Sequence, residues 1–262
     1  MSVRPALVLV TKGRPMSEQK LRLFTFPAAF GLPTAGPFGL KLEMALRMLE
    51  VSYERVFEMD NRKGPKRKSP WIEDGDTRIG DTELILEHVA RTRDVVLDEG
   101  TTPEERARGH VLRRALEEHF HQVFEYELLV HERSLDLVRQ MAAMSAPKIL
   151  ARPIAAYLRR TVRKHLFERG IARHSPAEIE AMGRADVDAL VAWLGDREWF
   201  VGDRPTKVDC IAFGLLAVAI RRELDTPVFA YVRAQPTLVA FVERVLARYF
   251  PEHASSVARA AA

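Results

Sequence analysis

The sequence predicts two domains, a small α/β domain followed by an all-helical one. Between residues 19 and 93, short segments that alternate in the manner of β-strands are interspersed with two segments of helical period. From residue 103 to residue 252, the long apolar patterns have the helical period. The chain of 262 residues is long enough for two domains, and 47% of its residues are apolar, which is enough for two cores.

Four short strands and two helices are expected in the first domain. The strands are expected at Leu21–Phe26, Val51–Phe57, Trp71–Glu73 and Thr77–Ile79, and the helices begin at Pro37 and at Asp81. Asp74-Gly75 should join the last two strands as a hairpin, because this dipeptide favours tight turns. In the first helix, Lys41 and Glu43 are expected to face water, opposite the apolar positions.

Helices should make up the whole second domain. They are expected at residues 103 to about 139, 147–169, 175–194, 210–220 and 237–249. The helix at 210–220 is apolar on all sides and must therefore be buried. Thr206 and Asp209 have the spacing of a capping box, which would satisfy the first N–H groups of that buried helix. We interpret this pair as structural.

Composition indicates a soluble protein of a reducing compartment. With 40 basic and 36 acidic residues the chain is only mildly basic, unlike a nucleic-acid-binding tail. The single cysteine, Cys210, allows no intrachain disulfide. The apolar run Ala6–Val10 is too short for a signal peptide or a membrane span. We expect a cytoplasmic protein in which residues 1–18 form a loose N-terminal extension.

Several motifs together resemble the glutathione S-transferase (GST) superfamily. Ser69-Pro70 precedes the predicted hairpin, and Asp81-Thr82 follows it at the start of a helix. The stretches at 36–47, 170–175 and 200–209 are similar to the branch of metaxins and failed-axon-connections proteins. The resemblance implies the GST fold, an α/β thioredoxin-like N-terminal domain (19–93) plus an all-α C-terminal domain (103–252). It also implies a homodimer.

The same resemblance implies a glutathione site. Pro70 would be cis, and Ser69 would offer its backbone N–H and C=O to the cysteinyl part of glutathione. Asp81 and Thr82 would hold the γ-glutamyl end, at a helix terminus that suits a carboxylate. Lys68, or Lys66, would meet the glycyl carboxylate. Taken singly these motifs have simpler readings, since Asp81 could be an ordinary helix cap.

An apolar electrophile would bind between the two domains. The residues expected near it are Phe120, Phe124 and Tyr126. Catalysis would consist of stabilising the glutathione thiolate and bringing it close to the electrophile.

The sequence departs from this branch at the position that usually stabilises the thiolate. The branch usually has Ser-Pro-Phe-Cys, whereas this chain has Gly36-Pro37-Phe38-Gly39. Thr34 could replace the missing hydroxyl as the catalytic residue, and so could Thr25, although both could equally be plain structural threonines. The alternative function is a non-catalytic binding protein that uses the fold for a protein partner or a membrane surface.

Two further groups of residues have simpler explanations than a special site. His110, His119, His121 and His131 lack the spacing of metal ligands, so we predict no metal and place these histidines on the surface or lining a pocket. The segment 148–173 is strongly basic and interleaved with apolar residues. It could lie on an anionic membrane, but we favour a helix whose basic side faces water.

Overall fold

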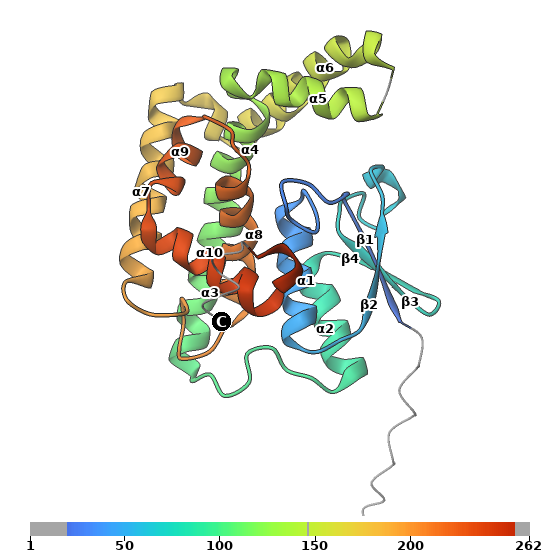
Figure 1. Ribbon diagram of the computed structural model, residues 1–262, viewed down its shortest axis with the longest axis vertical. Coiled ribbons are helices and arrows are strands. Elements are labelled where there is room, and N and C mark those ends of the chain that lie inside the picture. The colour runs from blue at the N-terminus through green and yellow to red at the C-terminus, as the bar shows by residue number, and fades with distance from the viewer. Residues whose placement is uncertain (1–19, 146, 255–262) are drawn as a thin grey trace, which may run out of the picture.

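The computed structural model describes residues 20–145 and 147–254, and Figure 1 shows its two parts side by side. The first part holds a four-stranded sheet of β1 (Leu21–Thr25), β2 (Tyr53–Phe57), β3 (Trp71–Asp74) and β4 (Thr77–Gly80). It also holds α1 (Pro37–Met48) and α2 (Thr82–Arg93). The β-α-β then β-β-α order and the thioredoxin-like class are as predicted. The expected extension at 1–18 lies outside the described residues.

The sheet has the strand order β2-β1-β3-β4, in which β1 is parallel to β2 and antiparallel to β3. Trp71 pairs with Phe24 on one side and with Gly80 on the other. The end of β1, the start of β3 and the end of β4 therefore meet at one edge of the sheet. We call this the ligand edge, because Pro70 and Asp81, which the sequence predicts at a ligand site, lie next to it in the chain.

The second part is helical. Its helices are α3 (Pro103–Arg114), α4 (His121–Leu129), α5 (Leu135–Ser145), α6 (Ala151–Glu168), α7 (Pro176–Leu194), α8 (Lys207–Arg221), α9 (Pro227–Arg233) and α10 (Pro236–Tyr249). The single helix expected at 103–139 is interrupted by a π-helical turn at Ala115–Phe120 and by a break after Leu129. The helix α9 was not predicted, because its seven residues are too few to show a period. Figure 1 shows α5 and α6 as a pair that projects beyond the rest.

The helix α8 forms the centre of the protein, and α1 packs against it. At Gly214 an added Cβ would lie 2.2 Å from the carbonyl oxygen of Pro37, so only glycine permits this approach. Asp209 accepts hydrogen bonds from the N–H of Phe200 (2.9 Å) and from the N–H of Thr206 (2.7 Å). The predicted buried helix and its capping pair are thereby confirmed.

The prediction that Lys41 and Glu43 face water was wrong. Both side chains are fully buried, because other elements cover the polar sides of α1: Lys41 lies against Thr82 and Glu83 of α2, and Glu43 lies against Tyr53 of β2. Among the residues that the structure describes, no helix is long and apolar enough to cross a membrane.

Candidate functional site

The ligand edge brings the two predicted halves of the glutathione site together. The Ser69–Pro70 peptide bond is cis, as the resemblance implies. The pairing of Trp71 with Gly80 brings Ser69 and Pro70, just before β3, near Asp81 and Thr82, just after β4. Within the described chain, the N–H and C=O of the half-buried Ser69 take part in no hydrogen bond. These main-chain groups are free to bind an extended ligand.

Asp81 has an unusual backbone at the start of α2. Its φ of 84° lies in a region that non-glycine residues rarely adopt, and such strain is concentrated at functional sites. The Oδ1 of Asp81 accepts from the N–H groups of Glu83 (3.0 Å) and Leu84 (3.3 Å). Asp81 is thus also the helix cap. The carboxylate is exposed, and its second oxygen, Oδ2, takes no part in these two hydrogen bonds.

Thr82 retains two donors for a ligand. Its side chain is buried, and its Oγ1 accepts a hydrogen bond from Lys41 Nζ at 2.7 Å. Because that lone pair is occupied, the hydroxyl hydrogen must point elsewhere. Neither this hydrogen nor the Thr82 N–H has an acceptor in the part of the chain that the structure describes.

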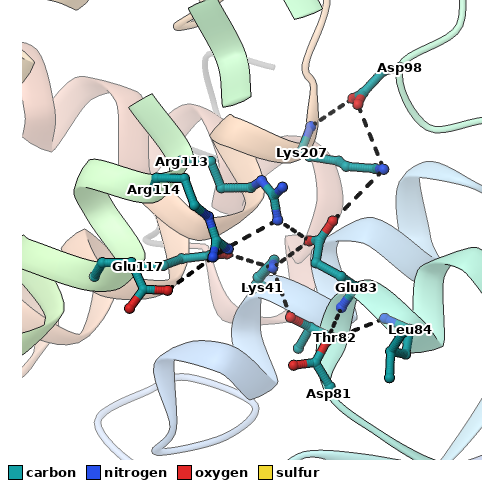
Figure 2. Close-up of polar contacts among 11 residues, drawn as sticks. Lys41, Asp81, Thr82, Glu83, Leu84, Asp98, Arg113, Arg114, Glu117 and Lys207 are labelled. Carbon is teal, nitrogen blue, oxygen red and sulfur yellow. Dashed lines mark hydrogen bonds and ion pairs between the residues drawn. The ribbon is translucent and has the colours of Figure 1, made fainter. Parts of the chain in front are cut away.

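Lys41 is the centre of a buried ion cluster, shown in Figure 2. Besides Thr82, its Nζ contacts Glu83 Oε1 at 2.8 Å and Glu117 Oε1 at 2.7 Å. The ammonium therefore has an acceptor for each of its three hydrogens. Arg114 also pairs with Glu117. The cluster joins α1 and α2 to the helical part of the protein.

Two cationic side chains of the helical part also approach the Glu83 carboxylate. Arg113 lies 2.7 Å from its Oε1, and Lys207 approaches to 4.0 Å. Burial alone would raise the pKa of Glu83, but Lys41, Arg113 and Lys207 together hold it below the usual value. Glu83 is thus kept ionised between the two domains, next to the candidate ligand residues.

The predicted catalytic Thr34 is fully buried. Its Oγ1 lies 2.9 Å from Thr25 Oγ1 and accepts from the Gly36 N–H at 3.3 Å. This pair of threonines fills the space beside Gly39, where an added Cβ would lie 2.4 Å from Thr25 Oγ1. A catalytic role for Thr34 stays a prediction that this buried position does not favour.

The other predicted residues differ in accessibility. Phe120 and Phe124 are 1% and 2% exposed and belong to the core, so neither presents an open surface to an electrophile. Tyr126 is half-buried, with its ring edge-on to His131. Lys68 is exposed and has no ion pair within the described residues, so its amine is free for an anion.

Three hollows lie among the described residues. One of about 170 Å³ is lined in part by Arg113 and Lys207, two members of the ion cluster. Neither this hollow nor the other two, of about 470 and 420 Å³, is lined by Ser69, Asp81 or Thr82. The described residues also contain no group of three or more side chains able to hold a metal ion.

Family models match both parts of the chain. A family model described as the glutathione S-transferase N-terminal domain matches residues 37–134, and one for the C-terminal domain matches residues 183–245. Together they cover more than half of the chain. The chain belongs to the glutathione S-transferase superfamily.

The relatives of this superfamily member include one that is named as an enzyme and two whose names state no activity. It is 26% identical to Failed axon connections of Drosophila melanogaster over 88% of this chain, but spans only 58% of that protein. It is 26% identical to a Metaxin-1 homolog of Caenorhabditis briggsae, covering 88% of this chain and 74% of the relative. An isoprene-epoxide glutathione S-transferase of Rhodococcus is 23% identical, and the match covers 87% of this chain and 99% of that protein.

Solved structures of the superfamily share the fold. The β-etherase LigF from Sphingobium superposes with a TM-score of 0.63 at 17% identity, covering 90% of this chain and 98% of that one. At this identity the likeness concerns the fold alone.

Sequence reasoning missed Lys41 and Glu117 as part of the site. Glu117 lies 76 residues from Lys41 along the chain, and no local pattern joins them. The sequence shows that the first helix contains Lys41, but it does not show which acidic residues pair with this lysine. Lys and Glu are so rarely fully buried that an exposed position was the expected one.

Proposed function

We propose that this protein binds glutathione at the ligand edge and conjugates its thiolate to an apolar electrophile. The observation that carries the proposal is the pair of free donors on Thr82, next to the strained Asp81. The γ-glutamyl carboxylate would accept from the Thr82 N–H and O–H, and Asp81 Oδ2 would face the ligand's ammonium group. The positive end of α2 favours a carboxylate here.

The remaining parts of the tripeptide have partners along the same edge. The N–H and C=O of Ser69 would bind the cysteinyl part, and Lys68 would meet the glycyl carboxylate. The thiol then lies towards the start of α1, near Gly36. The thiol proton passes to solvent, and the sulfur attacks a carbon of the electrophile, forming a C–S bond as the bond from that carbon to its leaving group or ring oxygen breaks. Tyr126, with Phe120 and Phe124 behind it, would form the apolar side of the electrophile site.

Calorimetric titration with reduced glutathione tests the proposal. We expect saturable binding, with a dissociation constant in the micromolar to millimolar range that is usual for substrates. Glutathione lacking the γ-glutamyl residue, the dipeptide Cys-Gly, is the matched ligand and should bind far more weakly. No heat signal with glutathione, in a protein that melts cooperatively, would exclude the proposal.

A second candidate is docking on an anionic membrane surface through α6. Tyr157 is 73% exposed and Phe167 is 49% exposed, although Arg173 covers one face of the Phe167 ring. Arg160 and Lys164 stand between these aromatic residues on the same outward side of the helix. Aromatic and basic residues on one exposed face are typical of helices that bind anionic lipid. This function would suit the non-catalytic alternative.

Co-sedimentation with lipid vesicles tests the second candidate. The protein should pellet with vesicles rich in phosphatidylserine and stay in solution with neutral phosphatidylcholine vesicles. Arg160→Glu combined with Tyr157→Ser should abolish pelleting, whereas Arg108→Glu on the exposed face of α3 should leave it unchanged. Equal behaviour of the protein with both kinds of vesicle would remove this candidate.

A further inference from the structure

The side chain of His121, in the helical part, contacts the start of α1. Its ring packs edge-on against Phe38, with 4.9 Å between the centroids and 85° between the planes. On its other side it lies 6.2 Å from the Phe124 ring. Phe38 is the second residue of α1, directly after Gly36 and Pro37. His121 therefore stands beside the place where the branch usually supplies a hydroxyl and this chain does not.

The ring nitrogens of His121 have no protein partner in the part of the chain that the structure describes. Three other histidines, in contrast, are engaged: His119 contacts Asp186 at 2.7 Å, His88 contacts Asp74 at 2.7 Å, and His131 accepts from a backbone N–H. Buried imidazoles normally find a hydrogen-bond partner. The half-buried, unpaired ring of His121 is thus available to a bound ligand.

The surroundings of His121 keep its ring neutral. Burial lowers the pKa of His121, and the nearby cations Arg169 and Lys68 lower it further against the opposing effect of Glu125 and Glu118. These two acids are themselves paired, Glu125 with Arg169 at 2.8 Å and Glu118 with Arg114 at 2.9 Å. A neutral imidazole carries one N–H donor and one acceptor nitrogen.

We infer that His121 is a catalytic residue whose ring N–H donates a hydrogen bond to the sulfur of bound glutathione. The inference rests on the proposed function. The thiol loses its proton to solvent, and the neutral imidazole stabilises the thiolate that remains. The sulfur then forms the C–S bond, and the displaced electron pair leaves on the electrophile's leaving group or ring oxygen.

The test measures the pKa of the thiol in the complex, by titrating thiolate absorbance, together with the affinity for glutathione by calorimetry. In His121→Ala we expect the pKa of the bound thiol to rise by about one unit, a tenfold loss of thiolate equal to about 1.4 kcal/mol. The affinity should change by no more than about threefold, because the γ-glutamyl and glycyl contacts remain. His121→Gln keeps an N–H donor, so the pKa of the bound thiol should lie between the value of the wild type and that of His121→Ala.

His119→Ala is the matched control, since His119 lies on the same stretch of chain but pairs with Asp186. Its complex should keep the thiol pKa of the wild type. If His121→Ala binds glutathione with an unchanged thiol pKa, the role of His121 is wrong while the glutathione site stands. If the wild type binds no glutathione, both proposals fall.

Discussion

Lys41 Nζ lies 2.7 Å from Thr82 Oγ1, and both side chains are buried. This contact links an ammonium group inside α1 to the residue that would hold the γ-glutamyl end of glutathione. Glu83 and Glu117 complete the environment of the ammonium from two different parts of the fold. The orientation of the Thr82 hydroxyl and the packing of the two domains therefore depend on the same charge.

Removing the charge of Lys41 should strongly destabilise the fold. In Lys41→Met, Glu83 and Glu117 lose their shared cation but keep Arg113 and Arg114, so the loss should be at most the roughly 3–5 kcal/mol that an unpaired buried charge costs. Without Lys41, the pKa of Glu83 should also rise. Urea denaturation measures the change in the free energy of unfolding. Lys164→Met, at a site 73% exposed, should stay within about 0.5 kcal/mol of wild type. Equal stability of the two variants would mean that the cluster does not hold the domains together.

The hydroxyl of Thr82 should matter for ligand binding more than its methyl group does. Thr82→Val removes one hydrogen bond to the ligand carboxylate, and such charge-assisted bonds contribute about 1.5–3 kcal/mol, which is a loss of affinity of roughly tenfold to a hundredfold. Thr82→Ser keeps the hydroxyl and should bind glutathione nearly as the wild type does. Calorimetry on all three proteins distinguishes these outcomes. Unaltered binding by Thr82→Val would place the γ-glutamyl group elsewhere.

How well each feature was predicted depended on how local its cause is. The capping pair of Thr206 and Asp209 is three residues apart, so its spacing is visible in the sequence. The buried state of Lys41 depends on Glu117, which is far along the chain, and on α8 covering α1. A helical pattern shows which side is apolar, but it cannot show that a polar side will also be covered.

The residues of the candidate site also fall into two groups, those with a local sequence signal and those placed by packing between distant segments. Asp81 and Thr82 were predicted as a pair because a helix start has a local signal. The burial of Thr34 was not predictable, since it results from packing of the loop against β1 and against Gly39. His121 lacks metal-ligand spacing, and only the packing of α4 on Phe38 shows where its ring lies.

Restoring the hydroxyl at position 36 should be possible, whereas position 39 is closed. At Gly36 an added Cβ would meet only the half-buried ring of Phe26, at 2.8 Å, and the backbone there is extended, as a helix cap requires. We expect Gly36→Ser to fold and to lower the pKa of the bound thiol by about one unit. Gly39→Ser would collide with Thr25 and Thr34, and overpacking of this kind costs about 1–3 kcal/mol.

Thermal melting and titration of the thiol absorbance check both variants. Gly39→Ser combined with Thr25→Ala should regain part of the stability, because the nearest colliding atom is gone. A Gly36→Ser complex whose thiol pKa equals that of the wild type would show that the sulfur does not lie at the start of α1.

Asp209 should make stability depend on pH in a direction opposite to that of most paired carboxylates. Burial raises its pKa from 3.8 to about 6, so folding favours the protonated form. Its contribution is fully present below the unfolded value and is lost as the pH rises through about 6, by about 3 kcal/mol in total. Asn cannot titrate, so the stability of the wild type minus that of Asp209→Asn should fall by about 2.4 kcal/mol between pH 4 and pH 7, the rest of the change lying below pH 4. Urea denaturation across that range measures it, with Asp203→Asn, at a site 95% exposed, as the control. A difference that stays constant with pH would mean that Asp209 ionises in the folded protein as easily as in the unfolded chain.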